Sequence, residues 1–246
     1  MRVVSIASGS KGNATVVEHD GSAILIDFGV PYKSLKGYEV EAVLVTHSHT
    51  DHICGIPTLV KRRDLPVYAN MMTAESVVHE CRVREDAFVC FENGQSFEIG
   101  PFTVQPFSIP HDTSDPVGFL IRAGGVAYFH GTDIGTPLDS VGLKLAEADV
   151  ATLESNHDPV MLRTSGRPPC LIQRIAGPRG HLSNDQACDL VKRFASPRLK
   201  RLALAHLSRD CNAPHLAEGA MRAALAEIGR GDVALSVLSQ NEAVEI

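Results

Sequence analysis

Four potential metal ligands are crowded into residues 46–52, which are Thr-His-Ser-His-Thr-Asp-His. His47, His49, Asp51 and His52 follow directly after the apolar run at 42–45, which has the composition of a buried strand. Imidazoles and a carboxylate suit zinc, iron or manganese, and a turn leaving a strand end can direct alternate side chains toward one point. Histidines on an ordinary surface turn are the alternative interpretation, but they do not account for this density. The segment therefore predicts a metal site at the end of a strand.

The number of ligands in this segment favours two metal ions over one. A single catalytic zinc ordinarily takes three protein ligands and keeps one position open. Hydrolases that use a pair of ions hold them about 3.5–4 Å apart. Such a pair needs further ligands downstream, including one anion that bridges both ions. We therefore expect a two-metal hydrolase with ligands from several parts of the chain.

Three later residues occupy the same kind of position, just beyond a short hydrophobic strand. They are His111 after residues 102–109, Asp133 after residues 126–129, and His206 after residues 202–205. Asp27 closes another apolar run, at 23–26, and suits a hydrogen bond to a ligating imidazole from behind. A sheet can bring all of these strand ends to one edge, so we expect the side chains to converge there.

Length and composition bound the architecture. The chain of 246 residues is 44% hydrophobic, enough for one sizeable α/β domain, and no Pro/Gly/Ser-rich linker or internal repeat divides it. We expect a single domain over residues 1–246. No apolar run reaches the roughly 18 residues of a membrane span, and the N-terminus lacks a signal-peptide pattern. The six cysteines form no C-x-x-C pair and are interpreted mainly as core fillers, so a reduced cytoplasm is the simplest setting.

Short strand patterns dominate the first half of the chain, and helical patterns become frequent in the second. Strands are expected at 3–7, 15–18, 23–26, 42–45, 67–69, 88–91, 102–105, 119–122, 126–129, 149–153 and 202–205. Helices are expected at about 55–63, 71–80, 138–147, 183–195 and 214–228. A strand-rich start with interleaved helices would suit two β-sheets with helices outside.

Basic residues gather in one part of a chain that is acidic overall. The formal net charge is −6, which does not favour a protein that stays permanently bound to nucleic acid. Residues 160–209 nevertheless carry ten Lys or Arg against two Asp. They either draw a polyanion toward His181 and His206 in the same segment or form solvated helix faces. The cluster Lys61-Arg62-Arg63 is interpreted as a solvated helix end.

Two backbone features favour a phosphate group. The turn Ser8-Gly-Ser-Lys-Gly-Asn13, with Lys11, can form an anion-binding nest, although a tight turn between strands needs glycine anyway. Ser183 is the expected N-cap of the 183–195 helix, so Gly180-His-Leu-Ser-Asn184 ends at a helix N-terminus, where backbone N–H groups favour phosphate. An ordinary capped helix is the alternative there.

The order of these motifs resembles the metallo-β-lactamase superfamily across nearly the whole chain. The resemblance is carried by Leu25-Ile-Asp-Phe-Gly29, His47-x-His49-x-Asp51-His52, His111, Asp133 and His206. Four shorter strings are similar to the YycJ/WalJ branch: Ser8-Gly-Ser-Lys-Gly-Asn13, Glu154-Ser-Asn-His-Asp158, Gly180-His-Leu-Ser-Asn184 and Ala205-His-Leu-Ser208. Members of that branch are described as metal-dependent hydrolases that act as DNA exonucleases.

The resemblance implies an αβ/βα sandwich, in which two β-sheets are flanked by helices. It implies one ion on His47, His49 and His111 and a second on Asp51, His52 and His206. Asp133 would bridge the two ions, and Asp27 would support the loop from behind. Branch members often carry two asparagines after the last His-Leu-Ser, whereas this chain has Arg209-Asp210-Cys211-Asn212. That departure bears on substrate contacts and touches no metal ligand.

The expected reaction is phosphodiester hydrolysis, with DNA ends as the substrate. Two divalent ions, zinc, manganese or iron, would share a water and lower its pKa until hydroxide is available for in-line attack on phosphorus. Asp51 would also orient the nucleophile, and His181 is the candidate for clamping the scissile phosphate or protonating the leaving oxygen. Further substrate contacts are expected from Lys11, Asn13, Asn156, His157 and Ser183. A structural, hydrogen-bonding role is the alternative for His157.

Two other functions fit the same residues. A hydrolase of a small ester, thioester, lactone, lactam or cyclic phosphodiester could use the same ions, because fold and metal site do not fix the substrate. A non-catalytic metal sensor would be expected to have lost one or more ligands, and all seven are present. The basic segment and Gly-His-Leu-Ser favour phosphodiesters.

Overall fold

The computed structural model describes residues 1–246, which divide into two compact units. The first unit consists of Met1–Ser108, Thr113–Gly125 and Ser239–Ile246, and the second of Ile109–Asp112 and Val126–Leu238. The chain therefore leaves each unit and returns to it, which is why neither unit corresponds to one continuous half of the sequence.

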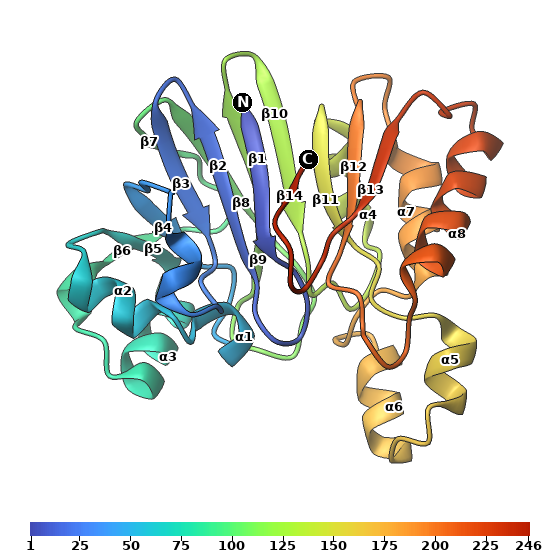
Figure 1. Ribbon diagram of the computed structural model, residues 1–246, viewed down its shortest axis with the longest axis horizontal. Coiled ribbons are helices and arrows are strands. Elements are labelled where there is room, and N and C mark those ends of the chain that lie inside the picture. Colours follow the sequence, from blue (N-terminus) through green and yellow to red (C-terminus); the bar gives the residue numbers. More distant parts are fainter. The chain divides into compact units, whose positions relative to one another are not determined.

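Fourteen strands and eight α-helices alternate along the chain (Figure 1). The strands are β1 (Arg2–Ala7), β2 (Ala14–His19), β3 (Ser22–Ile26), β4 (Ala42–Leu44), β5 (Val67–Asn70), β6 (Phe88–Phe91), β7 (Phe97–Ile99), β8 (Phe102–Ser108), β9 (Val117–Ala123), β10 (Val126–Gly131), β11 (Val150–Glu154), β12 (Arg201–Ala205), β13 (Ala234–Val237) and β14 (Val244–Glu245). The helices are α1 (Thr50–Ile53), α2 (Ile56–Arg62), α3 (Met71–Cys81), α4 (Asp139–Ala146), α5 (Pro159–Thr164), α6 (Pro169–Ala176), α7 (Asn184–Phe194) and α8 (Pro214–Glu227). Two short 3-10 helices occupy Tyr32–Leu35 and Glu85–Ala87.

The first sheet has the strand order β14-β1-β2-β3-β4-β5-β6 and belongs to the first unit. Strands β1, β2 and β3 pair antiparallel, whereas β3, β4, β5 and β6 pair parallel. The centre of this sheet is covered on both faces, because every residue of β4 and nearly every residue of β3 is buried. Such continuous apolar strands are typical of parallel sheets with helices on their faces.

The second sheet has the strand order β13-β12-β11-β10-β9-β8-β7. Strands β7, β8 and β9 form its antiparallel part, and β10, β11, β12 and β13 form its parallel part. In the second unit α7 packs against α4 and α8, and α8 packs against β13. Two mixed sheets with flanking helices confirm the predicted αβ/βα sandwich class, while the single domain over 1–246 stays a prediction.

Helix α7 shows why the second unit packs as it does. Ala187, Leu190 and Val191 are buried on one face, and the charged residues of the helix lie on the other. The Ser183 hydroxyl accepts a hydrogen bond from the Gln186 backbone N–H, and the Gln186 side chain accepts one from the Ser183 N–H. This reciprocal capping box satisfies the first backbone N–H groups of the helix and confirms Ser183 as its N-cap.

The predicted elements are all present, with ends displaced by one to a few residues. Six of these strands and α-helices were not predicted: the strands β7, β13 and β14, the helices α5 and α6, and the four-residue helix α1 inside the histidine segment. The missed strands have two to four residues, which is too short for an alternating pattern to stand out. No helix of this protein combines the length and apolar character needed to cross a bilayer.

The cysteines correct one expectation. All six are free thiols, and Cys188 and Cys211 are buried as expected for core residues. Cys54 is exposed, and so are Cys90 and Cys170, so the interpretation of these three as core fillers is wrong; Cys90 and Cys170 were expected in the core on the sequence pattern alone. Both lie in short elements, β6 and α6, whose surfaces the sequence pattern did not reveal.

Candidate functional site

Asp27 and the histidine segment leave neighbouring strands of the first unit. Strands β3 and β4 pair parallel, with Ile26 opposite Leu44, so their carboxyl ends lie side by side. Asp27 follows β3, and residues 46–52 follow β4. The Asp27 backbone N–H donates to the Leu44 carbonyl at 2.8 Å, which fixes the start of one loop against the other.

Asp27 is a buried carboxylate whose hydrogen bonds orient the segment. It accepts from the Thr46 backbone N–H at 2.8 Å and from the Thr46 hydroxyl, and its Oδ2 lies 2.7 Å from Nδ1 of His52. Since a carboxylate accepts, His52 donates through Nδ1 and keeps the lone pair of Nε2 for another partner. Asp27 also has a positive φ of 55°, a rare conformation for a residue other than glycine. The role predicted for Asp27, support from behind, fits this geometry.

Asn13 and Gly29 hold the other side of the segment. The Asn13 backbone N–H donates to the Asp51 carbonyl at 2.8 Å, and its side-chain Nδ2 lies 3.0 Å from Nε2 of His52. A Cβ on Gly29 would stand only 1.6 Å from the Asp51 carbonyl oxygen, so this position requires the absence of a side chain. Asn13 was predicted to contact substrate, and the structure gives it a positioning contact with the ligand loop.

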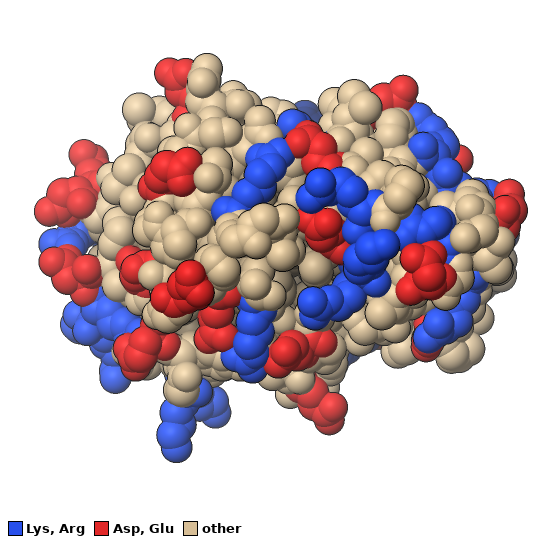
Figure 2. Space-filling model, turned by 90° about the horizontal axis from the view of Figure 1, so that it is seen from above, with Lys and Arg blue, Asp and Glu red and all other residues tan.

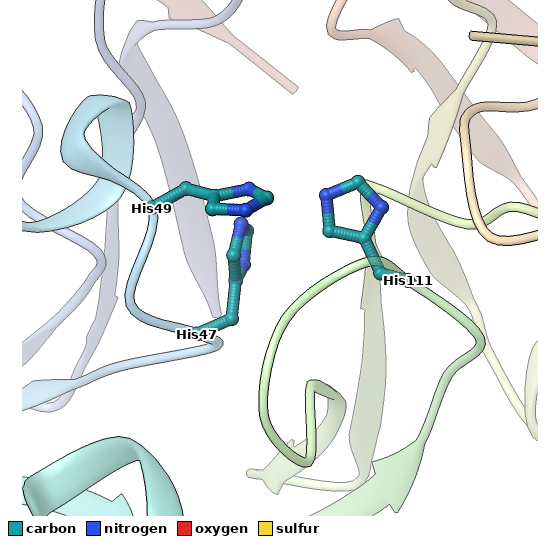
Figure 3. A group of neighbouring side chains, drawn as sticks. All are labelled: His47, His49 and His111. Atoms are coloured by element: carbon teal, nitrogen blue, oxygen red, sulfur yellow. The ribbon is translucent and has the colours of Figure 1, made fainter. Parts of the chain in front are cut away.

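The rings of His47 and His49 lie at close quarters on one loop (Figure 3). Their centroids are 4.8 Å apart with nearly perpendicular planes, and the His47 and His52 centroids are 4.0 Å apart. His47 and His52 are buried, His49 is half-buried, and Asp51 keeps 24% of its side chain exposed. This one short segment therefore brings three imidazoles and a carboxylate together.

The second unit gathers its own cluster at the carboxyl ends of parallel strands. Asp133 follows β10, Glu154 ends β11, and His206 follows β12. Oδ1 of Asp133 lies 3.7 Å from Nε2 of His111, 3.5 Å from Nδ1 of His181 and 3.6 Å from Nδ1 of His206. Asp133 and His206 both have positive φ values, of 60° and 57°. Strained backbone at residues with chemically active side chains is a frequent mark of a functional site.

Glu154 is the site residue that the sequence reasoning missed. It is fully buried, and its Oε1 lies 2.8 Å from Nδ1 of His181 and 3.2 Å from Nδ1 of His206. Its Oε2 accepts from the backbone N–H groups of Ile134 and Leu182. A signal was available, because Glu154 closes an apolar strand just as Asp27 and Asp133 do. Glu154 belongs to Glu154-Ser-Asn-His-Asp158, a string that indicated only the family, and so it was given no role of its own.

The charges of this cluster stabilise one another. Burial by itself raises the pKa of Glu154, but the charge and hydrogen bond of His181 and the hydrogen bond of His206 bring it down to about 2. Burial lowers the pKa of His181, but the charge and hydrogen bond of Glu154 and the charge of Asp133 raise it above the ordinary value. The pair is therefore an ionised carboxylate beside a histidine that retains its proton more readily than a free imidazole.

His111 is fixed by the segment that follows α6. Its Nδ1 lies 3.0 Å from the Gly180 carbonyl, so Nδ1 carries the proton and Nε2 is left to act as a ligand. The Arg179 guanidinium donates to the His111 carbonyl, and Arg174 pairs with Asp112 at 2.5 Å. Helix α6, seen in Figure 1 at the end where β11 and β12 finish, and the segment that follows it are thus tied to the His111 loop.

Two of the residues predicted to contact substrate, Asn156 and Ser183, have structural partners. Asn156 is buried and donates to the His206 carbonyl at 2.7 Å. Burial lowers the pKa of His157, which is 3% exposed. The Ser183 oxygen caps α7, and Lys11 is exposed on its turn. These observations give Asn156 and Ser183 positioning and capping roles, and direct contact with substrate stays a prediction for all of them.

Asn212 is the one asparagine in the segment Arg209-Asp210-Cys211-Asn212 that follows the last His-Leu-Ser. This side chain is buried, and its Nδ2 donates to the backbone carbonyls of Ser155 and Asn156. It also lies 2.9 Å from Oδ1 of Asn184. Asn212 therefore holds the turn after β11 and the start of α7 together, which is a packing role.

The basic segment 160–209 is split between two ends of the second unit. Arg201 begins β12 and His206 follows its last residue, so at about 3.3 Å per residue they lie roughly 16 Å apart. Arg198 and Lys200 precede Arg201, and Lys192 and Arg193 lie in the last turn of α7. Figure 2 looks onto the end at which β12 begins and shows Lys and Arg there, interspersed with Asp and Glu. Half of the ten cations are therefore solvated and remote from His206, and the other half lie on or near α5, α6 and the His206 loop.

The donor set fits a divalent metal. In the second unit, ligand atoms of Asp133, Glu154, His181 and His206 all lie within 4.8 Å of one another. Imidazole nitrogens and carboxylate oxygens in this combination suit zinc, manganese or iron. Buried carboxylates behind the imidazoles, Asp27 in one unit and Glu154 in the other, are the supporting partners that metal-ligating histidines usually have. The fold and these clusters define a metal-dependent hydrolase.

Comparison with known proteins gives the family. Residues 28–206 match the beta-lactamase superfamily domain, so the chain belongs to the beta-lactamase superfamily. It is 32% identical over 236 residues to exodeoxyribonuclease YycJ of Bacillus anthracis, covering 92% of this chain and 89% of that protein. The resemblance to the YycJ/WalJ branch is thereby confirmed.

Solved structures show the same fold. The metallo-beta-lactamase fold protein YhfI from Bacillus subtilis superimposes with a TM-score of 0.73 at 17% identity, covering 100% of this chain and 99% of that one. Zn(2+)-bound PqqB from Methylobacterium extorquens superimposes with a TM-score of 0.72 at 18% identity, covering 100% of both chains. At these identities the likeness establishes the architecture alone.

Proposed function

We propose that this protein is a metal-dependent phosphodiesterase that acts as a DNA exonuclease. The observation that carries the proposal is the likeness to exodeoxyribonuclease YycJ, which extends over 92% of this chain. The strand-end clusters support it, because each supplies histidines and carboxylates backed by a buried acid. The match includes every residue proposed below as a ligand, from His47 to His206.

Two divalent ions are proposed for the centre. The first would be held by His47, His49 and His111, the residues labelled in Figure 3, and the second by Asp51, His52 and His206. Asp133 would serve both ions. When bound, such a pair lowers the pKa of a water molecule and neutralises charge on the phosphoryl oxygens.

The remaining steps belong to the side chains of the chain itself. Asp27 keeps His52 in the tautomer that presents Nε2, and Gly180 does the same for His111. His181 is the proposed acid, because Glu154 raises its pKa and so favours its protonated form. The side chain of His181 is 20% exposed, whereas Glu154 is buried. His181 can therefore meet a phosphate oxygen while Glu154 orients it from behind.

Digestion of end-labelled nucleic acid tests the proposal. Single- and double-stranded DNA and RNA would be incubated with the protein after chelation and re-addition of zinc, manganese or iron. We expect metal-dependent release of nucleotides from DNA ends, and no release by the Asp133→Asn variant. Bis-p-nitrophenyl phosphate, nitrocefin and a thioester would be assayed in parallel. Hydrolysis of nitrocefin or the thioester, with every nucleic acid left intact, would overturn the proposed function in favour of a small-molecule hydrolase.

A further inference from the structure

A cavity in the first unit has a strongly basic lining. Its volume is about 740 Å³, and it opens where α2 and α3 end. Five of its lining residues are cationic and one is acidic: Lys61, Arg62, Arg63, Arg82, Arg84 and Asp64. The sequence suggested only a solvated helix end at residues 61–63. The fold brings Arg82 and Arg84, about twenty positions later in the chain, to the same cavity.

The nearby acids do not cancel this charge. Arg84 pairs with Asp64, and Arg63 lies 3.4 Å from Glu39. The side chains of Asp64 and Glu39 are 89% and 92% exposed, and ion pairs so open to water are weak. Lys61 and Arg82 are exposed and form no ion pair. Their charges are therefore available to a ligand.

Stabilisation of helix ends does not account for the whole cluster. Lys61 and Arg62 lie in the last turn of α2, and Arg82 is the C-cap of α3, where cations complement the helix dipole. The two C-termini together contribute about −1 charge. The lining carries five cations against one acid. A large positive excess remains after both helix ends are taken into account.

Part of the basic wall is held in a fixed shape. The Arg63 guanidinium donates to the Tyr32 hydroxyl at 3.0 Å, and Arg62 lies over the Tyr32 ring at 4.9 Å from its centroid. Only 22% of the Arg63 side chain is exposed. A preformed arrangement of guanidinium groups costs little side-chain entropy when it binds a phosphate.

Helix α2 connects the histidine segment, at the carboxyl end of β4, to the start of β5, which pairs parallel with β4, so the cavity lies toward the amino ends of β5 and β6. Helix α1 carries Asp51 and His52, and α2 begins three residues after it ends. Nine positions lead from His52 to Lys61 through two separate helices, so the rise of nine residues in one continuous α-helix, about 14 Å, is an upper limit for the distance along the helix axes. One strand of B-form DNA carries a phosphate about every 3.4 Å. The distance thus spans up to about four nucleotides.

We infer that this cavity is a second phosphate-binding site, which takes the backbone of a nucleic acid strand up to about four nucleotides from the bond that is cut. The inference rests on the proposed function for its substrate. The cavity floor includes Pro57, Val60 and Val83 and offers no aromatic face for stacking a base. Contacts with phosphate alone position a strand without selecting a sequence, which suits an enzyme that trims ends of any composition.

Salt-dependent binding tests the inference. The double variant Lys61→Gln/Arg82→Gln removes two of the three cations that have no ion pair, leaves Arg62 over the Tyr32 ring, and keeps unbranched side chains at both positions. Binding would be measured by fluorescence anisotropy with a single strand of about 20 nucleotides protected by phosphorothioate linkages. Each phosphate contact on a single strand contributes about 0.7 to the slope of log affinity against log salt. We expect the slope to fall by about 1.4 and Kd to rise about 25-fold at about 0.1 M salt.

A charge-matched control isolates the cavity. Lys192→Gln/Arg222→Gln removes two exposed cations from α7 and α8, and we expect it to leave the slope and Kd near wild type. Equal effects of the two double variants would overturn the inference, because they would show a general loss of charge. Competition with inorganic phosphate is a separate measurement in the same anisotropy assay. If millimolar phosphate displaces the strand from wild type as effectively as from the cavity variant, the strand is not held in the cavity.

Small substrates separate this inference from the proposed function. Bis-p-nitrophenyl phosphate is too small to span about 14 Å, so we expect the cavity variant to hydrolyse it at the wild-type rate. For an oligonucleotide longer than about four residues we expect kcat/KM to fall, and for a dinucleotide to stay unchanged. An equal loss on all three substrates would place the damage at the metal centre and refute a second site. If wild type digests no nucleic acid, the proposed function fails, while the anisotropy slope still decides whether the cavity binds a strand.

Discussion

Replacing Glu154 by glutamine is the sharpest perturbation of the second-unit cluster. Its two carboxylate oxygens face four donors: His181 and His206 at Oε1, and the Ile134 and Leu182 backbone N–H groups at Oε2. A glutamine has one oxygen and one NH2 group in the same space. With the amide NH2 toward Ile134 and Leu182, two buried backbone donors face another donor; with the NH2 toward His181 and His206, both imidazoles must give up their Nδ1 proton.

The expected loss of stability follows from those contacts. Each buried donor left without an acceptor costs about 1–3 kcal/mol, so two of them cost about 2–6 kcal/mol. The neutral amide offsets part of this, because a buried carboxylate carries a larger desolvation penalty. We expect a net loss of about 3 kcal/mol, which lowers Tm by roughly 6–12 °C for a chain of this size. Loss of a carboxylate behind a ligating histidine should weaken metal binding about 10- to 100-fold.

The pH dependence has a definite sign. The low pKa of Glu154, about 2, stabilises the folded protein above the carboxyl group's unfolded pKa, and this contribution is lost as pH falls toward 2. The raised pKa of His181 stabilises the fold below the unfolded histidine pKa, and this contribution is lost as pH rises through the folded value. The stability difference between wild type and variant should therefore be largest between these limits, at about pH 5–6. The basic limb of the pH–activity profile should move to lower pH in the variant, because His181 loses the charge that raises its pKa.

Thermal unfolding, metal titration and the pH–rate profile check these expectations. Glu75→Gln serves as the matched control, since Glu75 is exposed on α3. A Glu154→Gln variant that matched this control in Tm, in metal affinity and in the position of the basic limb would show that Glu154 supports neither the fold nor the metal centre. A fall in Tm without a change in metal affinity or in the basic limb would leave Glu154 as a packing residue only.

Three further substitutions probe the supports of the site. Asp27→Asn removes the charge that fixes the His52 tautomer; metal affinity measured by calorimetry should fall about 10- to 100-fold, and an unchanged affinity would contradict the assigned role. Gly29→Ala would place a Cβ against the Asp51 carbonyl, so the loop must shift; we expect a loss of about 1–3 kcal/mol in urea unfolding and a fall in kcat of about 100-fold, whereas wild-type kcat would show that the loop tolerates displacement. Asn212→Ala removes the donor to two buried carbonyls; stability should fall by about 2 kcal/mol with metal affinity unchanged, and a loss of affinity alone would argue against a packing role.

The sequence determined the elements and the positions of the chemistry along them. Apolar runs such as residues 23–26 and 42–45 are local signals, and the polar residue that ends each run is visible without any tertiary contact. Asp27, Asp133 and His206 were identified in this way, and each has the positive φ of a chain turning sharply out of a strand. The family followed from the order of these strand ends. Assignment of ligands to particular ions stays a prediction.

Only the tertiary structure decided which polar groups meet. Glu154 faces His181 and His206 across 27 and 52 positions of sequence, and Asn13 reaches His52 across 39. No local pattern encodes such pairs, because their hydrogen bonds depend on the relative placement of strands that the chain visits at different times. The same reason explains the basic residues: those at 192–201 were adjacent in sequence to the site segment but lie at the other end of β12, whereas Lys61 and Arg82, distant in sequence, line one cavity. Periodicity specifies which face of an element is buried, and packing alone specifies what that face meets.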